Sequence, residues 1–117
     1  MRVYIGGPLS GSNHIDYLKN VHKMIEVGDE LRRLGFSVYL PCLDLLLGIY
    51  AGDMEYKDYQ SLNAEWVSVA EALLVIDHSP GTDAEIMIAA SYKIPVFYTV
   101  ADLEYYRLVA EGGRNDT

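Results

Sequence analysis

The sequence predicts an α/β fold in which a doubly wound parallel sheet lies between two layers of helices. Short runs that are apolar throughout alternate with longer segments whose apolar residues recur at helical spacing. Strands without polar positions are typical of a parallel sheet that is covered on both faces. A length of 117 residues, 50% of them hydrophobic, fits one domain with a single core. We therefore expect a three-layer, flavodoxin- or Rossmann-like domain of four to five strands over residues 1–111, followed by a flexible tail over residues 112–117.

The first half of the chain contains two predicted strands and one long helix. The apolar run near the N-terminus ends at Gly6-Gly7-Pro8, which indicates a buried strand followed by a tight loop. Ser12 or Asn13 is suited to cap the long helix, and Gly35 lies where a left-handed residue ends a helix. The expected elements are a strand over residues 2–5, a helix over 13–34, a strand over 36–40, and over 42–50 either a short helix or a packed loop.

The second half continues the alternation of helix and strand. Residues 72–76 form the clearest strand, because no polar residue interrupts the run before Asp77. Pro95 falls near the start of the last apolar run, where a strand tolerates proline. The expected elements are a helix over residues 57–70, a strand over 72–76, a loop over 78–81, a helix over 83–92, a strand over 94–100 and a helix over 101–110.

Charge and composition exclude several classes of protein. The net charge is −8, and only Arg32 and Arg33 are adjacent among the 9 basic residues, so we expect neither a nucleic-acid polymer nor a membrane as partner. No apolar run approaches the roughly 20 residues of a membrane span, and the N-terminus lacks the pattern of a signal peptide. The single cysteine, Cys42, forms no internal disulfide, and no Cys/His cluster has metal-site spacing. We expect a cytoplasmic protein without metal or other cofactor.

Ligands of a doubly wound sheet bind beyond the carboxyl ends of the strands. That rule selects the loops over residues 6–13, from 41 onward and over 77–83. Glu85 follows the third loop and is the most interesting carboxylate there, yet Thr82-x-x-Glu85 also fits a capping box at a helix start. The glycines of the first loop allow close approach to a ligand, but the loop matches neither a dinucleotide fingerprint nor a P-loop, and a plain tight turn is the alternative.

Three segments in this order resemble nucleoside 2-deoxyribosyltransferase-like proteins, a group that includes deoxynucleoside 5′-monophosphate N-glycosidases and short phage-type members. The first segment is Val3-Tyr4-Ile5-Gly6-Gly7-Pro8-Leu9-Ser10-Gly11. The second is Asn63-Ala64-Glu65-Trp66, which precedes the strand over 72–76. The third is Gly81-Thr82-Asp83-Ala84-Glu85, followed by Ile94-Pro95-Val96. The resemblance extends over nearly the whole chain.

The resemblance implies a role for each matching position. It makes Glu85 the nucleophile that attacks the anomeric carbon of the sugar, and Tyr4 the residue that orients this glutamate. It makes Ser79 a contact of the 5′-phosphate. A covalent sugar ester on Glu85 is then released to another base or to water, without a cofactor. The substrate-binding residues expected in the loops are Gly6, Gly7, Ser10, Asp77, Ser79 and Gly81.

Two positions depart from the resemblance. Asn63 stands where an aspartate usually handles the leaving base, and an asparagine hydrogen-bonds a base without delivering a proton to it. Asp77, Asp58 and Glu65 are alternative proton donors. Ser10 stands where the glycosidases often carry an arginine, which weakens the expected contact with a 5′-phosphate.

Two functions therefore remain open. The first is an enzyme that cleaves N-glycosidic bonds of nucleosides or nucleotides, or transfers 2-deoxyribosyl groups between bases, through Glu85, Tyr4 and Asn63. The second is a nucleotide-binding module of the same fold with little or no catalysis. We also expect a homo-oligomer, with a two-fold dimer as its unit, because residues 43–50 are rich in Leu and Tyr beyond what one short sheet covers. The resemblance likewise implies active sites that a neighbouring subunit completes.

Overall fold

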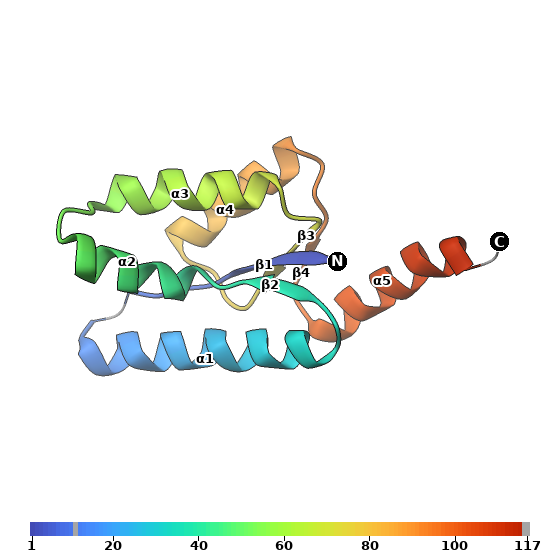
Figure 1. The fold of residues 1–117 in the computed structure, drawn as a ribbon, viewed down its shortest axis with the longest axis horizontal. Coiled ribbons are helices and arrows are strands. Elements are labelled where there is room, and N and C mark those ends of the chain that lie inside the picture. Colours follow the sequence, from blue (N-terminus) through green and yellow to red (C-terminus); the bar gives the residue numbers. More distant parts are fainter. Residues whose placement is uncertain (11, 116–117) are drawn as a thin grey trace.

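The computed structural model describes residues 1–10 and 12–115, and it contains a four-stranded parallel sheet between layers of helices (Figure 1). The α/β class and the three-layer parallel sheet predicted from the sequence are confirmed, with four strands. The elements are β1 (Arg2–Gly6), α1 (His14–Arg33), β2 (Ser37–Tyr39), the 3-10 helix η1 (Pro41–Leu43), α2 (Asp44–Ala51), α3 (Tyr56–Ser68), β3 (Ala72–Val75), α4 (Pro80–Ser91), β4 (Val96–Phe97) and α5 (Val100–Asn115).

The order of the strands determines where a ligand site belongs. The order is β2-β1-β3-β4, and every neighbouring pair is parallel. The chain leaves β1 for β2 on one side and then returns to place β3 on the other side of β1. The strand order therefore reverses between β1 and β3, which is where doubly wound sheets open a crevice at their carboxyl ends.

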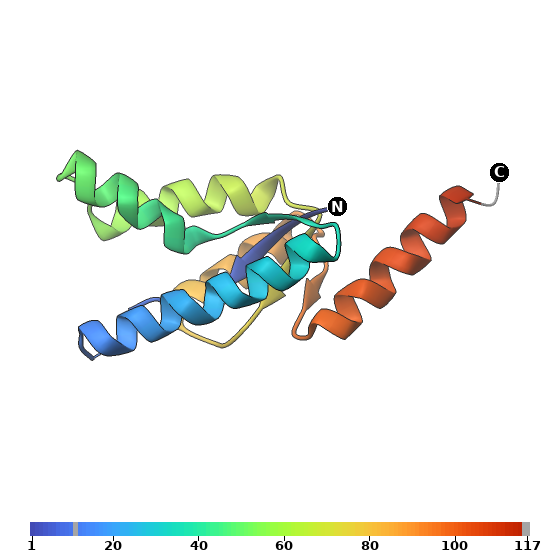
Figure 2. The ribbon, with the colours of Figure 1, turned by 60° about the horizontal axis from the view of Figure 1, so that its bottom comes forward.

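Alternate residues of the central strands supply two cores. Val3, Ile5, Ala72 and Leu74 face one side of the sheet, where they pack with buried residues of α1 and α5. Tyr4, Leu73 and Val75 face the other side, where α3 and α4 cover them. Figures 1 and 2 show α1 on one face and the pair α3 and α4 on the other. Apart from the exposed Arg2 that begins β1, both central strands are buried on both faces, which explains why the rest of their sequences is apolar.

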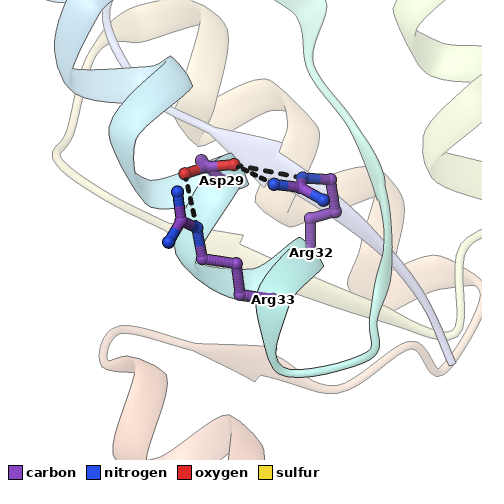
Figure 3. Close-up of polar contacts among 3 residues, drawn as sticks. All are labelled: Asp29, Arg32 and Arg33. Carbon is purple, nitrogen blue, oxygen red and sulfur yellow. Dashed lines mark hydrogen bonds and ion pairs between the residues drawn. The ribbon is translucent and has the colours of Figure 1, made fainter.

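Helix α1 begins and ends as the sequence predicts. The side chain of Asn13 caps it by accepting a hydrogen bond from the backbone N–H of Asp16, and Gly35 has the left-handed φ of 93° expected just past its end. In the last turn, Arg32 and Arg33 both donate to the carboxylate of Asp29 (Figure 3). Their N–H groups hold the pKa of Asp29 below its usual range, with the hydrogen bonds from Arg32 contributing most.

Several boundaries differ from those the sequence predicts. Helix α4 begins at Pro80 instead of residue 83, because Ser79 caps it and proline is favoured in a first turn. The segment expected as a short helix or a packed loop is helical, as η1 and α2. Helix α5 continues to Asn115, through residues predicted as a tail; residues 116–117 of that tail, and residue 11 of the first loop, lie outside the described residues.

Helix α5 extends away from the rest of the chain near the end of the sheet where β1 begins (Figures 1 and 2). Leu103 near its start is buried against the sheet, but Tyr105, Leu108 and Val109 farther along are exposed. In the part of the chain that the structure describes, no helix has both the length and the apolar character to span a bilayer.

Candidate active site

A cavity of about 720 Å³ opens at the carboxyl ends of β1 and β3, where the strand order reverses. Its walls come from the loop after β1, from α1 and η1, from one face of α3, and from the first turns of α4. This volume falls within the range of about 300–1,000 Å³ that is typical of sites for small molecules. The fold thus places a ligand-sized cavity where its topology predicts one.

Glu85 lines this cavity from the second turn of α4. Its Oε2 atom is buried and has no hydrogen-bond partner among the described residues. Burial is the main cause that raises the pKa of this carboxyl to about 7, and the nearby Tyr4 hydroxyl acts in the opposite direction. Near neutral pH the carboxyl is therefore close to half ionised, so a large share of it is available as a nucleophile.

The capping-box alternative for Glu85 is wrong. The residue that caps α4 is Ser79, whose Oγ accepts a hydrogen bond from the backbone N–H of Thr82 at 3.1 Å. The Thr82 hydroxyl is itself buried and pairs with Ser79 Oγ at 2.9 Å. Because the helix begins three residues earlier than predicted, Glu85 lies one turn beyond the position from which a capping glutamate acts.

Tyr4 lies in β1 near Glu85 and outside the described cavity wall, with its side chain fully buried. Its hydroxyl and Glu85 Oε2 are not in full hydrogen-bond geometry, yet they are close enough for each group to shift the pKa of the other. Burial raises its pKa far above the usual value, and the neighbouring Glu85 raises it further. The Tyr4 hydroxyl therefore keeps its proton at any physiological pH, so it acts toward Glu85 as a donor only.

Asn63 reaches the same cavity from α3. Its Oδ1 atom is buried and lacks a hydrogen-bond partner among the described residues. Buried polar atoms are almost always paired, and each exception calls for an explanation. The unpaired oxygens of Glu85 and Asn63 in one cavity are explained if a bound ligand supplies their partners.

Four of the expected loop residues also line the cavity. Gly7, Ser10, Ser79 and Gly81 are all part of its wall. Gly6 lies just behind the wall, where a Cβ atom would approach Thr82 Cγ2 to 3.3 Å and Glu85 Oε2 to 3.6 Å. A side chain at position 6 would therefore press on Thr82, while its Cβ atom would only touch the Glu85 carboxyl.

The three alternative acids of the sequence lie outside the cavity wall. Asp77 is exposed, and its Oδ1 accepts a hydrogen bond from the backbone N–H of His78 at 2.8 Å. Asp58 is committed to the capping box at the start of α3, and Glu65 is exposed on that helix. Asp77 is therefore not placed as a substrate-binding residue, because it belongs to the turn after β3 rather than to the wall. Glu85 is the one carboxylate in the described wall.

Tyrosines line much of the cavity, which sequence reasoning missed. Tyr17, Tyr56 and Tyr59 all belong to the wall. The Tyr17 hydroxyl is buried without a partner among the described residues, and the Tyr59 hydroxyl packs on the backbone of Gly48. Aromatic walls suit a flat ring such as a nucleobase. In the sequence, the only sign of this aromatic wall is the high number of tyrosines, which is ten.

Among the residues that the structure describes, neither a cationic side chain nor a metal site accompanies the carboxylate. The described wall contains no lysine or arginine, and the adjacent Arg32 and Arg33 bind Asp29 at the far end of α1 (Figure 3). Across residues 1–10 and 12–115, no three His, Cys, Asp or Glu side chains gather closely enough to hold a metal ion. The groups of the cavity are suited to hydrogen bonding, to stacking, and to attack by one carboxylate.

The raised pKa of Glu85 predicts a stability difference that depends on pH. The pKa of Glu85 is about 7 in the folded chain and 4.5 for an ordinary glutamate, which is the value expected in the unfolded chain. The unfolded chain therefore loses this proton at lower pH, and the free energy of unfolding of the wild type falls as the pH rises from about 4.5. Glu85→Gln removes that loss of stability. We expect the variant to be more stable than wild type at pH 8, by up to about 3 kcal/mol, and to match it at pH 4. Urea unfolding at both values measures this, and an equal difference at both would contradict it.

Comparison with known families places most of this chain in one of them. The family described as "Domain of unknown function (DUF4406)" matches residues 1–98, which include all four strands and every residue of the cavity wall. No curated protein matches the chain.

Proposed function

The chain belongs to the family described as a domain of unknown function (DUF4406), and from the geometry of its cavity we propose that it cleaves the N-glycosidic bond of 2′-deoxynucleosides or their 5′-monophosphates. The observation that carries this proposal is the buried Glu85 carboxyl. It lines a ligand-sized cavity beside the Tyr4 hydroxyl, and its Oε2 has no partner among the described residues. The resemblance to nucleoside 2-deoxyribosyltransferase-like proteins supports the same reaction.

The reaction divides into two steps. In the first, an oxygen of ionised Glu85 attacks C1′ of the sugar, and the bond from C1′ to the base nitrogen breaks with its electron pair going to the base. In the second, water or another base attacks C1′ of the resulting ester and releases Glu85 as a carboxylate. Water gives the free sugar, and a base gives a new nucleoside.

Tyr4 and the groups of the wall each have a part in these steps. The Tyr4 hydroxyl donates toward Glu85 and orients the attacking oxygen, which is the role of a third group beside an activated nucleophile. Tyr17, Tyr56 and Tyr59 provide the aromatic surface for the base. Asn63 hydrogen-bonds the base edge through its amide. The departing base then takes its proton from water, because Glu85 is the one carboxylate of the described wall.

A second candidate function is nucleotide binding without turnover, and Asn63 is the residue that favours it. Retaining glycosidases use two carboxyl groups, one of them as the acid that protonates the leaving group. The described wall supplies only Glu85. A protein that only binds a base, through hydrogen bonds from Asn63 and stacking on tyrosines, needs no second acid.

Incubation of the protein with the common 2′-deoxynucleosides and their monophosphates, with and without acceptor bases, separates the two functions. Chromatography of the mixture should show free base from at least one substrate, or a new nucleoside when an acceptor is present. Ribonucleosides provide the comparison, because the 2′-hydroxyl disfavours positive charge at C1′. Saturable binding of these compounds without any release of base would favour the binding module.

We also propose that the protein is a homodimer in the cytoplasm. Leu46, Leu47, Ile49 and Tyr50 of α2 are more than half exposed, and Tyr50 is 87% exposed. Several exposed large apolar side chains on one short helix are typical of an interaction site. Light scattering at micromolar concentration should give twice the chain mass of 13.1 kDa. The monomer mass would contradict the dimer.

A further inference from the structure

Three aromatic rings form a stack that begins beside Glu85 and ends at the surface. The rings of Tyr4 and Tyr39 are 5.4 Å apart with an interplanar angle of 17°. The rings of Tyr39 and Trp66 are 5.0 Å apart with an angle of 21°. Tyr4 is fully buried, Tyr39 is partly buried, and Trp66 is 46% exposed. Tyr39 thus packs on the Tyr4 ring from the neighbouring strand.

Asp44 fixes the Tyr39 end of this stack. It is the first residue of α2, and its Oδ1 accepts a hydrogen bond from the Tyr39 hydroxyl at 2.8 Å. A carboxylate only accepts hydrogen bonds, so the Tyr39 proton points to Asp44 and away from Tyr4. The Asp44 carboxyl is partly buried, and its Oδ2 has no partner among the described residues. Neither Asp44 nor Tyr39 lines the cavity, so an effect of this pair on the cavity passes through Tyr4.

We propose that Asp44 and Tyr39 are a positioning pair for the nucleophile: Asp44 holds the Tyr39 hydroxyl, Tyr39 holds the Tyr4 ring, and the Tyr4 hydroxyl is thereby aimed at Glu85. This inference rests on the proposed function, since it assigns a task in that reaction. Nothing in the resemblance or in the sequence pattern pointed to Asp44. The alternative is that Asp44 merely stabilises the start of α2, as acidic residues do in first turns.

Steady-state kinetics distinguish positioning from simple stabilisation. Tyr39→Phe keeps the ring but deletes the donor, and Asp44→Ala deletes the acceptor. Each should lower kcat between about 10-fold and 100-fold with KM unchanged within about twofold, because a small misplacement of a reacting group costs this much. The double variant should be no slower than either single one, since both remove the same hydrogen bond. Asp44→Asn, which retains an acceptor oxygen, should recover most of the rate.

Asp102→Ala is the matched control. Asp102 is also an acidic residue in the first turn of a helix, but it is exposed on α5. This variant should keep the wild-type kcat and KM. Unchanged kcat in Tyr39→Phe and Asp44→Ala would overturn the positioning role, and so would equal losses in Asp44→Ala and Asp44→Asn.

A titration that needs no substrate tests the same inference separately. Carbon NMR of protein labelled at glutamate carboxyls follows Glu85, whose signal is the one missing from Glu85→Gln. The Tyr4 hydroxyl favours the ionised form of Glu85, so Tyr4→Phe should raise the pKa of Glu85 above its value of about 7. If Tyr39 positions Tyr4, Tyr39→Phe should also raise the pKa of Glu85.

The sign of that shift is decisive. Without its donor, Asp44 gains a proton more readily, and the loss of that nearby negative charge would by itself lower the pKa of Glu85. A rise in Tyr39→Phe therefore reports the displacement of Tyr4, and an unchanged or lowered pKa would overturn the inference. If the wild-type protein releases no base, the proposed function is contradicted. The titration still decides separately whether Asp44 and Tyr39 position Tyr4.

Discussion

Glu85→Gln is expected to reduce turnover by at least about three orders of magnitude while changing substrate affinity by less than about threefold. The amide has nearly the shape of the carboxyl and retains hydrogen-bonding capacity, but it has neither the charge nor the nucleophilicity needed to form the ester. Base release under saturating substrate gives kcat, and calorimetric titration gives the affinity.

Glu65→Gln is the matched control for this change. Glu65 is exposed on α3 and does not line the cavity, so its substitution should leave both turnover and affinity unchanged. Equal turnover in wild type and Glu85→Gln would contradict the assignment of Glu85 as the nucleophile. Loss of affinity together with turnover would instead make Glu85 a binding residue.

Asn63→Asp is expected to increase base release by between about 10-fold and 1,000-fold. The change is nearly isosteric, and it introduces an acid into the same cavity as Glu85. A carboxyl beside a second buried carboxyl has a raised pKa, which keeps it partly protonated near neutral pH. It is then able to protonate the departing base, and general acid catalysis contributes about 10²–10⁴-fold in enzymes. The initial rate of base release measures the effect.

Gln60→Glu is the control for Asn63→Asp, because it adds a carboxyl to the same wall about one helical turn earlier. It should not increase the rate, since proton delivery depends on position. If the protein only binds nucleotides, Asn63→Asp should weaken binding and release no base. Unchanged affinity and unchanged cleavage would show that position 63 does not contact the ligand.

The sequence predicts the fold well because burial on both faces leaves a strong signal. Strands β1 and β3 contain no polar residue at positions that the helices cover, and α1 carries a helical apolar pattern between Asn13 and Gly35. The weakest predictions concern ends of elements. Ser79 and Pro80 at the start of α4 resemble a loop in sequence, yet they are a cap and a first turn in the structure.

The candidate site was only partly predictable for a different reason. Glu85, Asn63 and the loop glycines lie near strand ends or in segments with a recognisable pattern. Tyr17 and Tyr59 reach the cavity from helical faces whose orientation depends on how α1 and α3 pack, and no local pattern reports that packing. Asp44 and Tyr39 become significant only through a contact between α2 and β2, which the sequence does not reveal.

A covalent bond between Glu85 and the sugar separates the proposed reaction from binding alone and from direct attack by water. Protein quenched in acid during turnover of a 2′-deoxynucleoside, then analysed by intact and peptide mass spectrometry, reports that bond. The expected result is the added mass of one 2-deoxyribosyl group on the peptide that contains Glu85, increased in amount when acceptor base is withheld and absent in Glu85→Gln. Release of base without any adduct, or an adduct on a different residue, would contradict the proposed role of Glu85.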